Sequence, residues 1–200
     1  MKYLAVVAGL LIPTFAVAES DRGEFALKGV GTVECHVFLE HAEEQSNLYW
    51  NIGGWVDGYV TGYNGYVEDT FDIGSFTLGA PSDVLLTLVG RHCQNNQSDR
   101  LGFVVKSLVE QLHFIRLDQH SEVVEFAVDG EEYATYAQTL IKVQQVLKDG
   151  GHYTGSADGV FGPNTRRAIE SFQEAEGLTV SGLPTPDVLF MILVRAGREG

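Results

Sequence analysis

Apolar residues recur three or four positions apart along most of the chain, the spacing that places them on one face of an α-helix. In the first half, this pattern predicts helices over about 33–45, 47–63, 82–93 and 98–115. Ser82 is expected to cap the third helix and Ser98 or Asp99 the fourth, because such side chains accept hydrogen bonds from free backbone N–H groups. Residues 64–81 are rich in glycine and other turn-forming residues and predict a long connection.

The second half repeats the helical spacing in shorter segments. Apolar positions and their stop signals predict three helices, over about 136–149, 163–175 and 185–193. Pro163 suits the first turn of the second of these helices, and Thr185-Pro186 has the form of a cap followed by proline. The glycine-rich segment 152–162 is expected to be a compact loop. Together the two halves predict an all-α protein.

Three glycines lie four residues apart in the segment 47–63. Gly54, Gly58 and Gly62 fall on one face of the predicted helix. Each costs about 1 kcal/mol of helix stability relative to alanine, so a packing gain is expected to offset it. We therefore expect a neighbouring helix to approach this face closely.

The first eighteen residues have the features of a signal peptide. Lys2 supplies a positive charge, residues 3–15 are almost wholly apolar, and Ala16-Val17-Ala18 matches the small-x-small cleavage pattern. A membrane anchor is the alternative, but the apolar stretch is shorter than the roughly 20 residues that a spanning helix needs. We expect cleavage after residue 18 and a soluble, exported protein in the periplasm, with no membrane partner after cleavage.

The chain has two cysteines, and export changes how they are interpreted. In an oxidising compartment, Cys35 and Cys93 are most simply one disulfide. Each cysteine has a histidine neighbour, His36 or His92, so a Cys2His2 metal site is the alternative. Zinc motifs usually place paired ligands two to four residues apart, whereas adjacent side chains diverge. We therefore predict a disulfide and no metal.

Charge divides the expected mature chain into two unequal parts. Residues 19–130 contain 18 acids and 6 bases, whereas residues 131–200 contain 9 acids and 6 bases. This asymmetry predicts a helical domain over 19–130 and a second domain over 131–200. The full sequence has a net charge of −14, which repels phosphate backbones and excludes nucleic acid as a partner.

Two cysteines and a helix rich in tryptophan, glycine and tyrosine form a pattern over residues 35–115. Its positions are Cys35, Trp50, Gly54, Trp55, Gly58, Tyr59, Gly62, Tyr63 and Cys93. The pattern resembles the periplasmic HdeA-like helical domains, which include acid-resistance chaperones and immunity proteins that block type VI cell-wall amidases. The resemblance implies an immunity or chaperone-like module that binds a periplasmic protein partner.

The second half carries a more specific motif. Its positions are Val143-Gln144, Leu147, Gly151-His152-Tyr153, Asp158-Gly159, Phe161-Gly162, Thr165, Ala168-Ile169, Phe172-Gln173, Gly177-Leu178 and Gly182. In order and spacing it resembles the peptidoglycan-binding type 1 domain over about 137–195. The resemblance implies a three-helix, non-catalytic module that attaches exported proteins, often hydrolases, to the cell wall. Asp187 stands near where the family usually carries a threonine.

Four residues of this second half are candidates for contacting peptidoglycan. An aromatic side chain and hydrogen-bonding groups suit a ligand of sugars and short peptides, which selects Tyr153, Asp158 and Gln173. Arg166 can pair with a carboxylate of the stem peptide. The alternative is structural, because Asp158 can shape its loop and Gln173 can bond to the backbone.

No catalytic motif is present. The chain lacks the H-E-x-x-H, G-x-S-x-G and S-x-x-K patterns, and a disulfide would consume both cysteines. We therefore predict a non-catalytic, wall-anchored binding protein that needs no cofactor. The alternative is a peptidoglycan hydrolase or remodelling enzyme with a carboxylate-based site in the N-terminal domain, at residues such as Glu43, Asp57 or Glu68.

Overall fold

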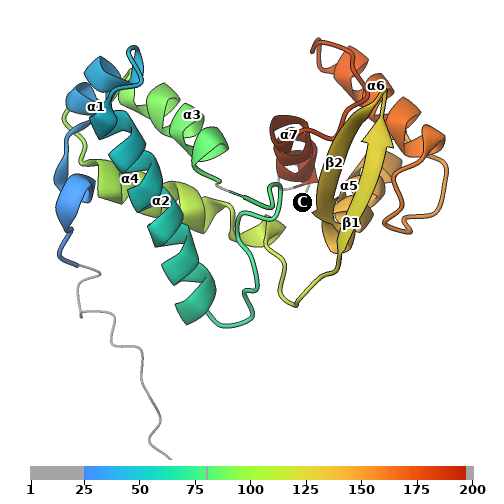
Figure 1. The fold of residues 1–200 in the computed structure, drawn as a ribbon, viewed down its shortest axis with the longest axis horizontal. Coiled ribbons are helices and arrows are strands. Elements are labelled where there is room, and N and C mark those ends of the chain that lie inside the picture. The colour runs from blue at the N-terminus through green and yellow to red at the C-terminus, as the bar shows by residue number, and fades with distance from the viewer. Residues whose placement is uncertain (1–24, 80, 197–200) are drawn as a thin grey trace, which may run out of the picture.

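The computed structural model describes residues 25–79 and 81–196 as two helical halves joined by a β-hairpin (Figure 1). The first half contains η1 (Gly29–Thr32), α1 (Cys35–Ala42), α2 (Asn47–Tyr66), α3 (Ser82–Cys93), α4 (Leu101–Gln111) and η2 (His113–Ile115). The hairpin consists of β1 (Val123–Val128) and β2 (Glu131–Tyr136), and α5 (Ala137–Asp149), α6 (Pro163–Ala175) and α7 (Pro186–Ala196) follow. The predicted signal peptide, residues 1–18, lies outside the described residues. Within them, no helix has the length and apolar character needed to cross a bilayer.

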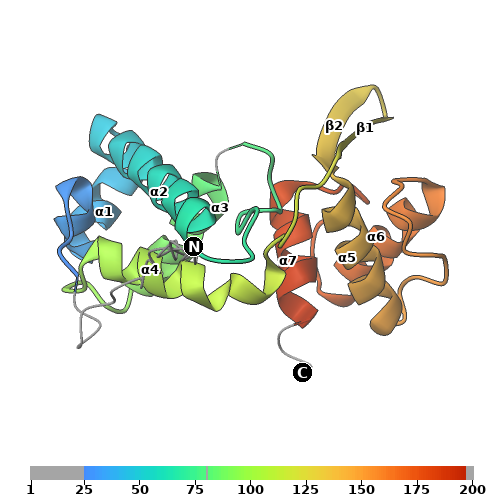
Figure 2. The same cartoon turned by 90° about the horizontal axis from the view of Figure 1, so that it is seen from below.

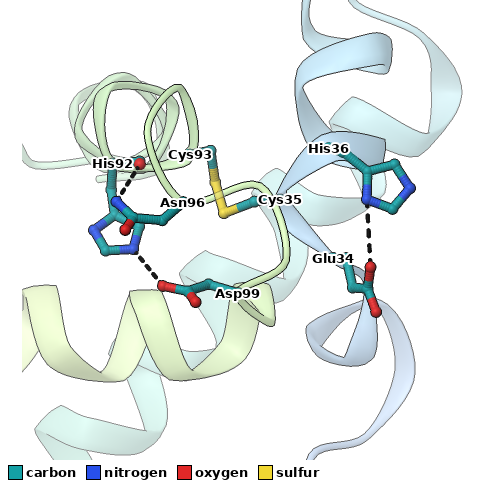
Figure 3. Close-up of a disulfide and its surroundings, with 7 residues drawn as sticks. All are labelled: Glu34, Cys35, His36, His92, Cys93, Asn96 and Asp99. Atoms are coloured by element: carbon teal, nitrogen blue, oxygen red, sulfur yellow. Dashed lines mark hydrogen bonds and ion pairs between the residues drawn. A yellow bond between two sulfur atoms is a disulfide. The ribbon is translucent and has the colours of Figure 1, made fainter.

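The first half has a core that the predicted apolar positions fill. Phe38, Ile52, Val56, Leu85 and Val105 are all buried between α1, α2, α3 and α4. The predicted disulfide is confirmed: the two cysteines are buried and join the start of α1 to the end of α3 (Figure 3).

The histidines beside the cysteines have carboxylate partners of their own. His36 Nδ1 lies 3.4 Å from a carboxylate oxygen of Glu34, and His92 Nε2 lies 2.8 Å from one of Asp99 (Figure 3). In the described part of the chain, no group of three or more histidine, cysteine or acidic side chains is arranged to hold a metal ion. The two cysteines that the alternative Cys2His2 site would need are bonded to each other in the disulfide.

The predicted helix caps are wrong for α3 and α4. Ser82 is already inside α3, and its backbone N–H and hydroxyl both donate to the carboxylate of Asp57, at 3.0 and 3.2 Å. A side chain from α2 therefore satisfies the start of α3. The residue before α4 is Arg100, and neither Ser98 nor Asp99 caps this helix. Local spacing could not reveal a cap supplied from a different helix.

The expected close helix contact at the glycine stripe is also wrong. A Cβ atom built on Gly54, Gly58 or Gly62 would meet nothing within 4 Å. The neighbouring Gly53 is the buried glycine, and a Cβ there would lie 3.7 Å from a methyl carbon of Leu86 on α3. Periodicity identifies a face of a helix, but it does not identify what lies opposite that face.

The prediction of an all-α protein needs correction, because β1 and β2 form a two-stranded antiparallel sheet. Residues 123–128 alternate in burial, and Phe126 pairs with Tyr133 across the strands. Asp129 and Gly130 form the turn, both with positive φ, 54° and 90°, as a tight hairpin requires. The predicted domain boundary between residues 130 and 131 falls on this turn, and the division into domains stays a prediction.

The second half packs against the first along α5 and α7. In both views α7 lies between the first half and the remaining helices of the second half (Figures 1 and 2). The rings of Phe76 and Phe190 meet edge to face at 5.2 Å, and the buried hydroxyl of Thr139 donates to the carbonyl of Ser75 at 2.8 Å. These buried contacts hold the two halves in one arrangement.

Candidate functional site

The loop 150–162 of the second half is organised around one buried side chain. The amide of Gln144 on α5 is fully buried, and its oxygen accepts the backbone N–H of Gly159 at 2.9 Å. Its nitrogen donates to Asp158, to the carbonyl of Val160 and to the hydroxyl of Thr165, at 3.0–3.2 Å. This single glutamine therefore sets the path of the loop.

Tyr153 and Asp158, two of the predicted ligand contacts, belong to that loop. Tyr153 is 8% exposed, and its hydroxyl donates to the carbonyl of Ser156 at 3.0 Å. A carboxylate oxygen of Asp158 accepts the N–H of Val160 at 3.0 Å. This bond and the one from Gln144 hold the pKa of Asp158 below its usual value. Both side chains thus have structural partners within the loop.

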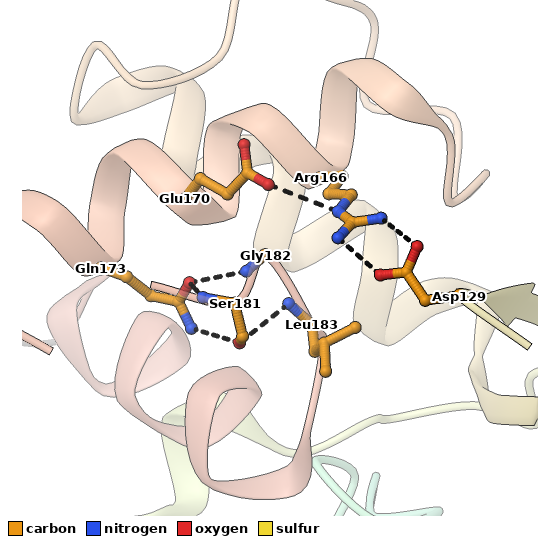
Figure 4. Close-up of polar contacts among 7 residues, drawn as sticks. All are labelled: Asp129, Arg166, Glu170, Gln173, Ser181, Gly182 and Leu183. Atoms are coloured by element: carbon orange, nitrogen blue, oxygen red, sulfur yellow. Dashed lines mark hydrogen bonds and ion pairs between the residues drawn. The ribbon is translucent and has the colours of Figure 1, made fainter. Parts of the chain in front are cut away.

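Gln173 fixes the turn that leads from α6 toward α7. The residue is 1% exposed, and its amide oxygen accepts the N–H groups of Ser181 and Gly182 at 2.9 and 2.8 Å (Figure 4). Its amide nitrogen donates to the hydroxyl of Ser181 at 3.1 Å. The side chain is therefore fully engaged with the backbone it supports.

Arg166 is half-buried, with its side chain 34% exposed. Its guanidinium donates two hydrogen bonds to Asp129 at the hairpin turn, at 2.8 and 3.3 Å, and pairs with Glu170 (Figure 4). The guanidinium hydrogen bonds lower the pKa of Asp129. An exposed pair of this kind contributes little to stability, so a ligand carboxylate can exchange with Asp129.

The four predicted contacts lie at three different places in the second half. Tyr153 and Asp158 are in the loop before α6, Gln173 is buried at the turn after it, and Arg166 faces the hairpin. Their role in binding peptidoglycan stays a prediction, and their observed hydrogen bonds fit the structural alternative for Asp158 and Gln173.

The first half contains a hollow of about 460 Å³ between α1, α2 and α3, here called the helical groove. Glu43, at the end of α1, is the carboxylate among its lining residues. Tyr49 stacks on Phe38 at 6.1 Å between ring centroids and meets Trp50, which is 57% exposed, edge to face at 5.3 Å. The groove is lined by Phe38, Leu39, Ala42, Glu43, Tyr49, Leu86, Thr87, Gly90 and Gln94.

The three carboxylates predicted for a hydrolase differ in their surroundings. Glu43 lines the helical groove, whereas the carboxylate of Asp57 is bonded to the start of α3. Glu68 is exposed in the connection after α2. Thr87 on α3 and Gln94 at the end of α3 also line the helical groove, and the sequence analysis did not predict this. They lie far along the chain from α1 and belong to no motif.

Comparison with known families identifies one segment of the chain. Residues 137–192 match the family described as "Putative peptidoglycan binding domain". This segment is a peptidoglycan-binding domain. The match confirms the resemblance predicted from the motif between Val143 and Gly182, and it begins immediately after the hairpin. It supports peptidoglycan as a ligand, while a protein partner stays a prediction.

Curated relatives share this domain over about 63 residues. The spore cortex-lytic enzyme of Bacillus cereus is 41% identical over 32% of the chain and 22% of its own length. The "Putative OxPP cycle protein OpcA" of Synechocystis is 46% identical over 30% of the chain and 13% of its own length. The N-acetylmuramoyl-L-alanine amidase CwlM of Mycobacterium tuberculosis is 35% identical over 32% of the chain and 16% of its own length. The matches thus span less than a quarter of each relative, and no solved structure matches the chain.

These relatives contradict the prediction of a non-catalytic, wall-anchored binding protein. Two of the proteins that share residues 137–192 are named as a lytic enzyme and an amidase, which favours the hydrolase alternative. The absence of the sequence motifs does not decide against this alternative, because the two carboxylates of a glycosidase are placed by the fold and have no fixed spacing in sequence. The HdeA-like resemblance of the first half stays a prediction.

Proposed function

We propose that this protein is an exported enzyme that hydrolyses or remodels peptidoglycan. In this proposal, residues 137–192 hold the wall and the first half acts on it. The observation that carries the proposal is the domain shared with a spore cortex-lytic enzyme and an amidase. A binding domain raises the local concentration of a polymeric substrate at a second site on the same chain, so the two functions support each other.

The helical groove is the proposed site of action, with Glu43 as the acid or base. A carboxyl group within reach of a scissile bond can protonate the leaving group or take a proton from the attacking water. Tyr49 and the exposed Trp50 offer aromatic faces beside it, and aromatic rings with polar edges suit sugar faces. Gln94 and Thr87 add hydrogen-bonding groups along the same groove.

The periplasm is the proposed location. The signal-peptide pattern of residues 1–18 supports export, and a disulfide such as that between Cys35 and Cys93 forms and persists in an oxidising compartment. Peptidoglycan is the polymer that an exported protein meets there.

Purified sacculi test the proposal directly. The protein is incubated with them, bound protein is measured by co-sedimentation, and released fragments are measured in the supernatant by mass spectrometry. We expect the wild-type protein to co-sediment and to release fragments. Glu43→Gln is expected to bind equally well and to lose at least 100-fold in release, the usual scale for removing a general acid or base.

Glu44→Gln supplies the matched control. Glu44 is the next residue along the chain and is exposed, but it does not line the helical groove. This variant is expected to release fragments at the wild-type rate. Co-sedimentation without release by the wild-type protein would refute an enzymatic role, and equal losses in both variants would refute the assignment of Glu43.

A further inference from the structure

A second groove separates the two halves of the molecule, here called the α3–α7 groove. It consists of two adjoining hollows of about 220 and 210 Å³ that share Leu88, Arg91, Phe190 and Met191. One wall is α3 from the first half, and the other is α7 from the peptidoglycan-binding domain (Figures 1 and 2). The groove is therefore built from both halves, and neither half contains it alone.

The α3–α7 groove connects two other hollows of the molecule. Thr87 lines both the α3–α7 groove and the helical groove that contains Glu43. At the far end, Phe172, Glu176 and Arg195 also line a hollow of about 110 Å³ on the peptidoglycan-binding domain. Adjacent hollows thus lead from the domain that holds the wall to the proposed catalytic carboxylate.

The α3–α7 groove is lined by both apolar and charged side chains. Leu88, Phe190 and Met191 supply apolar surface, and Met191 is partly exposed. Arg91 and Asp187 both line the first hollow, on opposite walls. Such a combination accepts a short chain with small apolar side chains, a carboxylate for the arginine and an N–H group for the aspartate.

Arg91 is available for an anion. Its side chain is exposed and has no hydrogen bond or ion pair among residues 25–79 and 81–196. The half that carries it is strongly acidic, with 18 acids against 6 bases over residues 19–130. A carboxylate-bearing ligand is repelled by most of this surface, so a cation at the junction concentrates the attraction there.

We propose that the α3–α7 groove binds the peptide portion of peptidoglycan, with Arg91 pairing to one of its carboxylates. This inference rests on the proposed function and names the part of the polymer that lies between the two halves. The peptide contacts α7 of the binding domain and α3 of the first half together, and the attached glycan extends toward Glu43. The groove thereby orients the polymer for the helical groove.

The contacts at the junction keep the groove in shape. Phe76 from the first half packs against Phe190, whose ring also lines the groove. The hydrogen bond from Thr139 to Ser75 is buried on both sides, so the two halves do not separate without leaving polar groups unpaired. A groove held in this way loses little entropy on binding a ligand.

Two soluble probes test the inference: a muropeptide disaccharide that carries its stem peptide, and the same disaccharide with the peptide removed. Calorimetric titration gives the dissociation constant of each for the full protein. We expect the peptide-bearing probe to bind more tightly. Arg91→Gln should raise the dissociation constant of the peptide-bearing probe three- to tenfold and leave that of the bare disaccharide unchanged, as expected for the loss of one partly exposed charged hydrogen bond.

Two further variants separate charge from structure. Arg91→Lys keeps the charge without the planar fork and is expected to recover part of the affinity. Arg100→Gln removes another exposed arginine of the first half that lines neither groove, and it should change nothing. Circular dichroism confirms that each variant is folded.

Distinct outcomes overturn the inference and the proposed function. Equal affinity of wild type and Arg91→Gln for the peptide-bearing probe overturns the groove assignment. Equal affinity of the wild-type protein for the probes with and without the peptide overturns it as well. If sacculi are still digested in that case, the proposed function stands and only the groove inference falls. Failure of the wild-type protein to digest sacculi removes the proposed function itself.

Discussion

Replacing Gln144 with leucine tests how the peptidoglycan-binding domain builds its loop. Leucine has a similar size and keeps the buried volume, but it removes every hydrogen bond of the amide. The N–H of Gly159, which is buried, loses its acceptor at 2.9 Å, and leaving such a group unpaired costs about 1–3 kcal/mol. The bonds to Asp158 and Val160 are replaced in part by water, because both residues are exposed. The bond to the buried hydroxyl of Thr165 is lost as well, and together these losses amount to about 3 kcal/mol of unfolding free energy.

Thermal and urea unfolding followed by circular dichroism measure this loss. For a chain of 200 residues whose two halves unfold together, about 3 kcal/mol corresponds to a fall in Tm of roughly 6–12 °C. Gln145→Leu is the matched control, because Gln145 is exposed and its amide donates only to Asp149, four residues later. That variant should stay within about 0.5 kcal/mol of wild type. If Gln144→Leu also stays within that range, the loop is not organised by Gln144.

Three other predictions concern stability and protonation. Replacing Cys35 and Cys93 by alanine removes the disulfide, which closes a loop with a sequence separation of 58. On the chain-entropy model this should lower the unfolding free energy by about 4 kcal/mol. Equal midpoints of urea unfolding for the wild type and the double variant would contradict this. Burial, aided by a nearby carboxylate, raises the pKa of Tyr59 to about 12. Stability should therefore fall between pH 10 and 12, where Tyr59 ionises only in the unfolded chain. An ultraviolet titration in which Tyr59→Phe loses absorbance change near pH 10, and not near pH 12, would contradict this. Gly159 has a φ of +73°, and a Cβ atom there would lie 2.9 Å from the carbonyl oxygen of Ala137. Gly159→Ala should therefore destabilise the protein more than Gly151→Ala, where a Cβ atom meets nothing within 4 Å. Equal Tm values of these two variants would contradict this.

Local patterns predicted the helices well, because each helix buries one face against a shared core. Phe38 and Val56 lie on the apolar stripes expected from sequence and are buried. The disulfide was also predictable, since the signal-peptide pattern places two cysteines in an oxidising compartment. The peptidoglycan-binding domain could be predicted from its sequence motif, because its loops require particular residues at fixed positions, such as Gly159 with its positive φ.

The hairpin was missed although its signal was present. Asp129-Gly130 is a strong turn signal for a hairpin when apolar residues alternate on either side, and Val124, Phe126 and Val128 do alternate. The charged residues after the turn made this segment resemble a polar linker. A two-stranded sheet is marginal alone, and here it is supported by Phe126 stacking on Phe161 at 4.5 Å between ring centroids. Sequence alone does not show that long-range contact.

The candidate sites could not be predicted, because residues from distant segments form them. The helical groove combines Glu43 with Gln94, and the α3–α7 groove combines Arg91 with Asp187. No spacing rule links such pairs. Conversely, Gln173 was a reasonable ligand candidate by residue type, and only its burial shows that its amide supports a turn.

We propose that this protein cuts the polymer that its peptidoglycan-binding domain is expected to hold. The most direct measurement is the mass of soluble material released from purified sacculi over time by the wild-type protein. We expect fragments that accumulate linearly with enzyme concentration and carry the added mass of water at the cut, as hydrolysis requires, or the mass of a rearranged product. Protein bound to sacculi that release no soluble fragment at any concentration would contradict it.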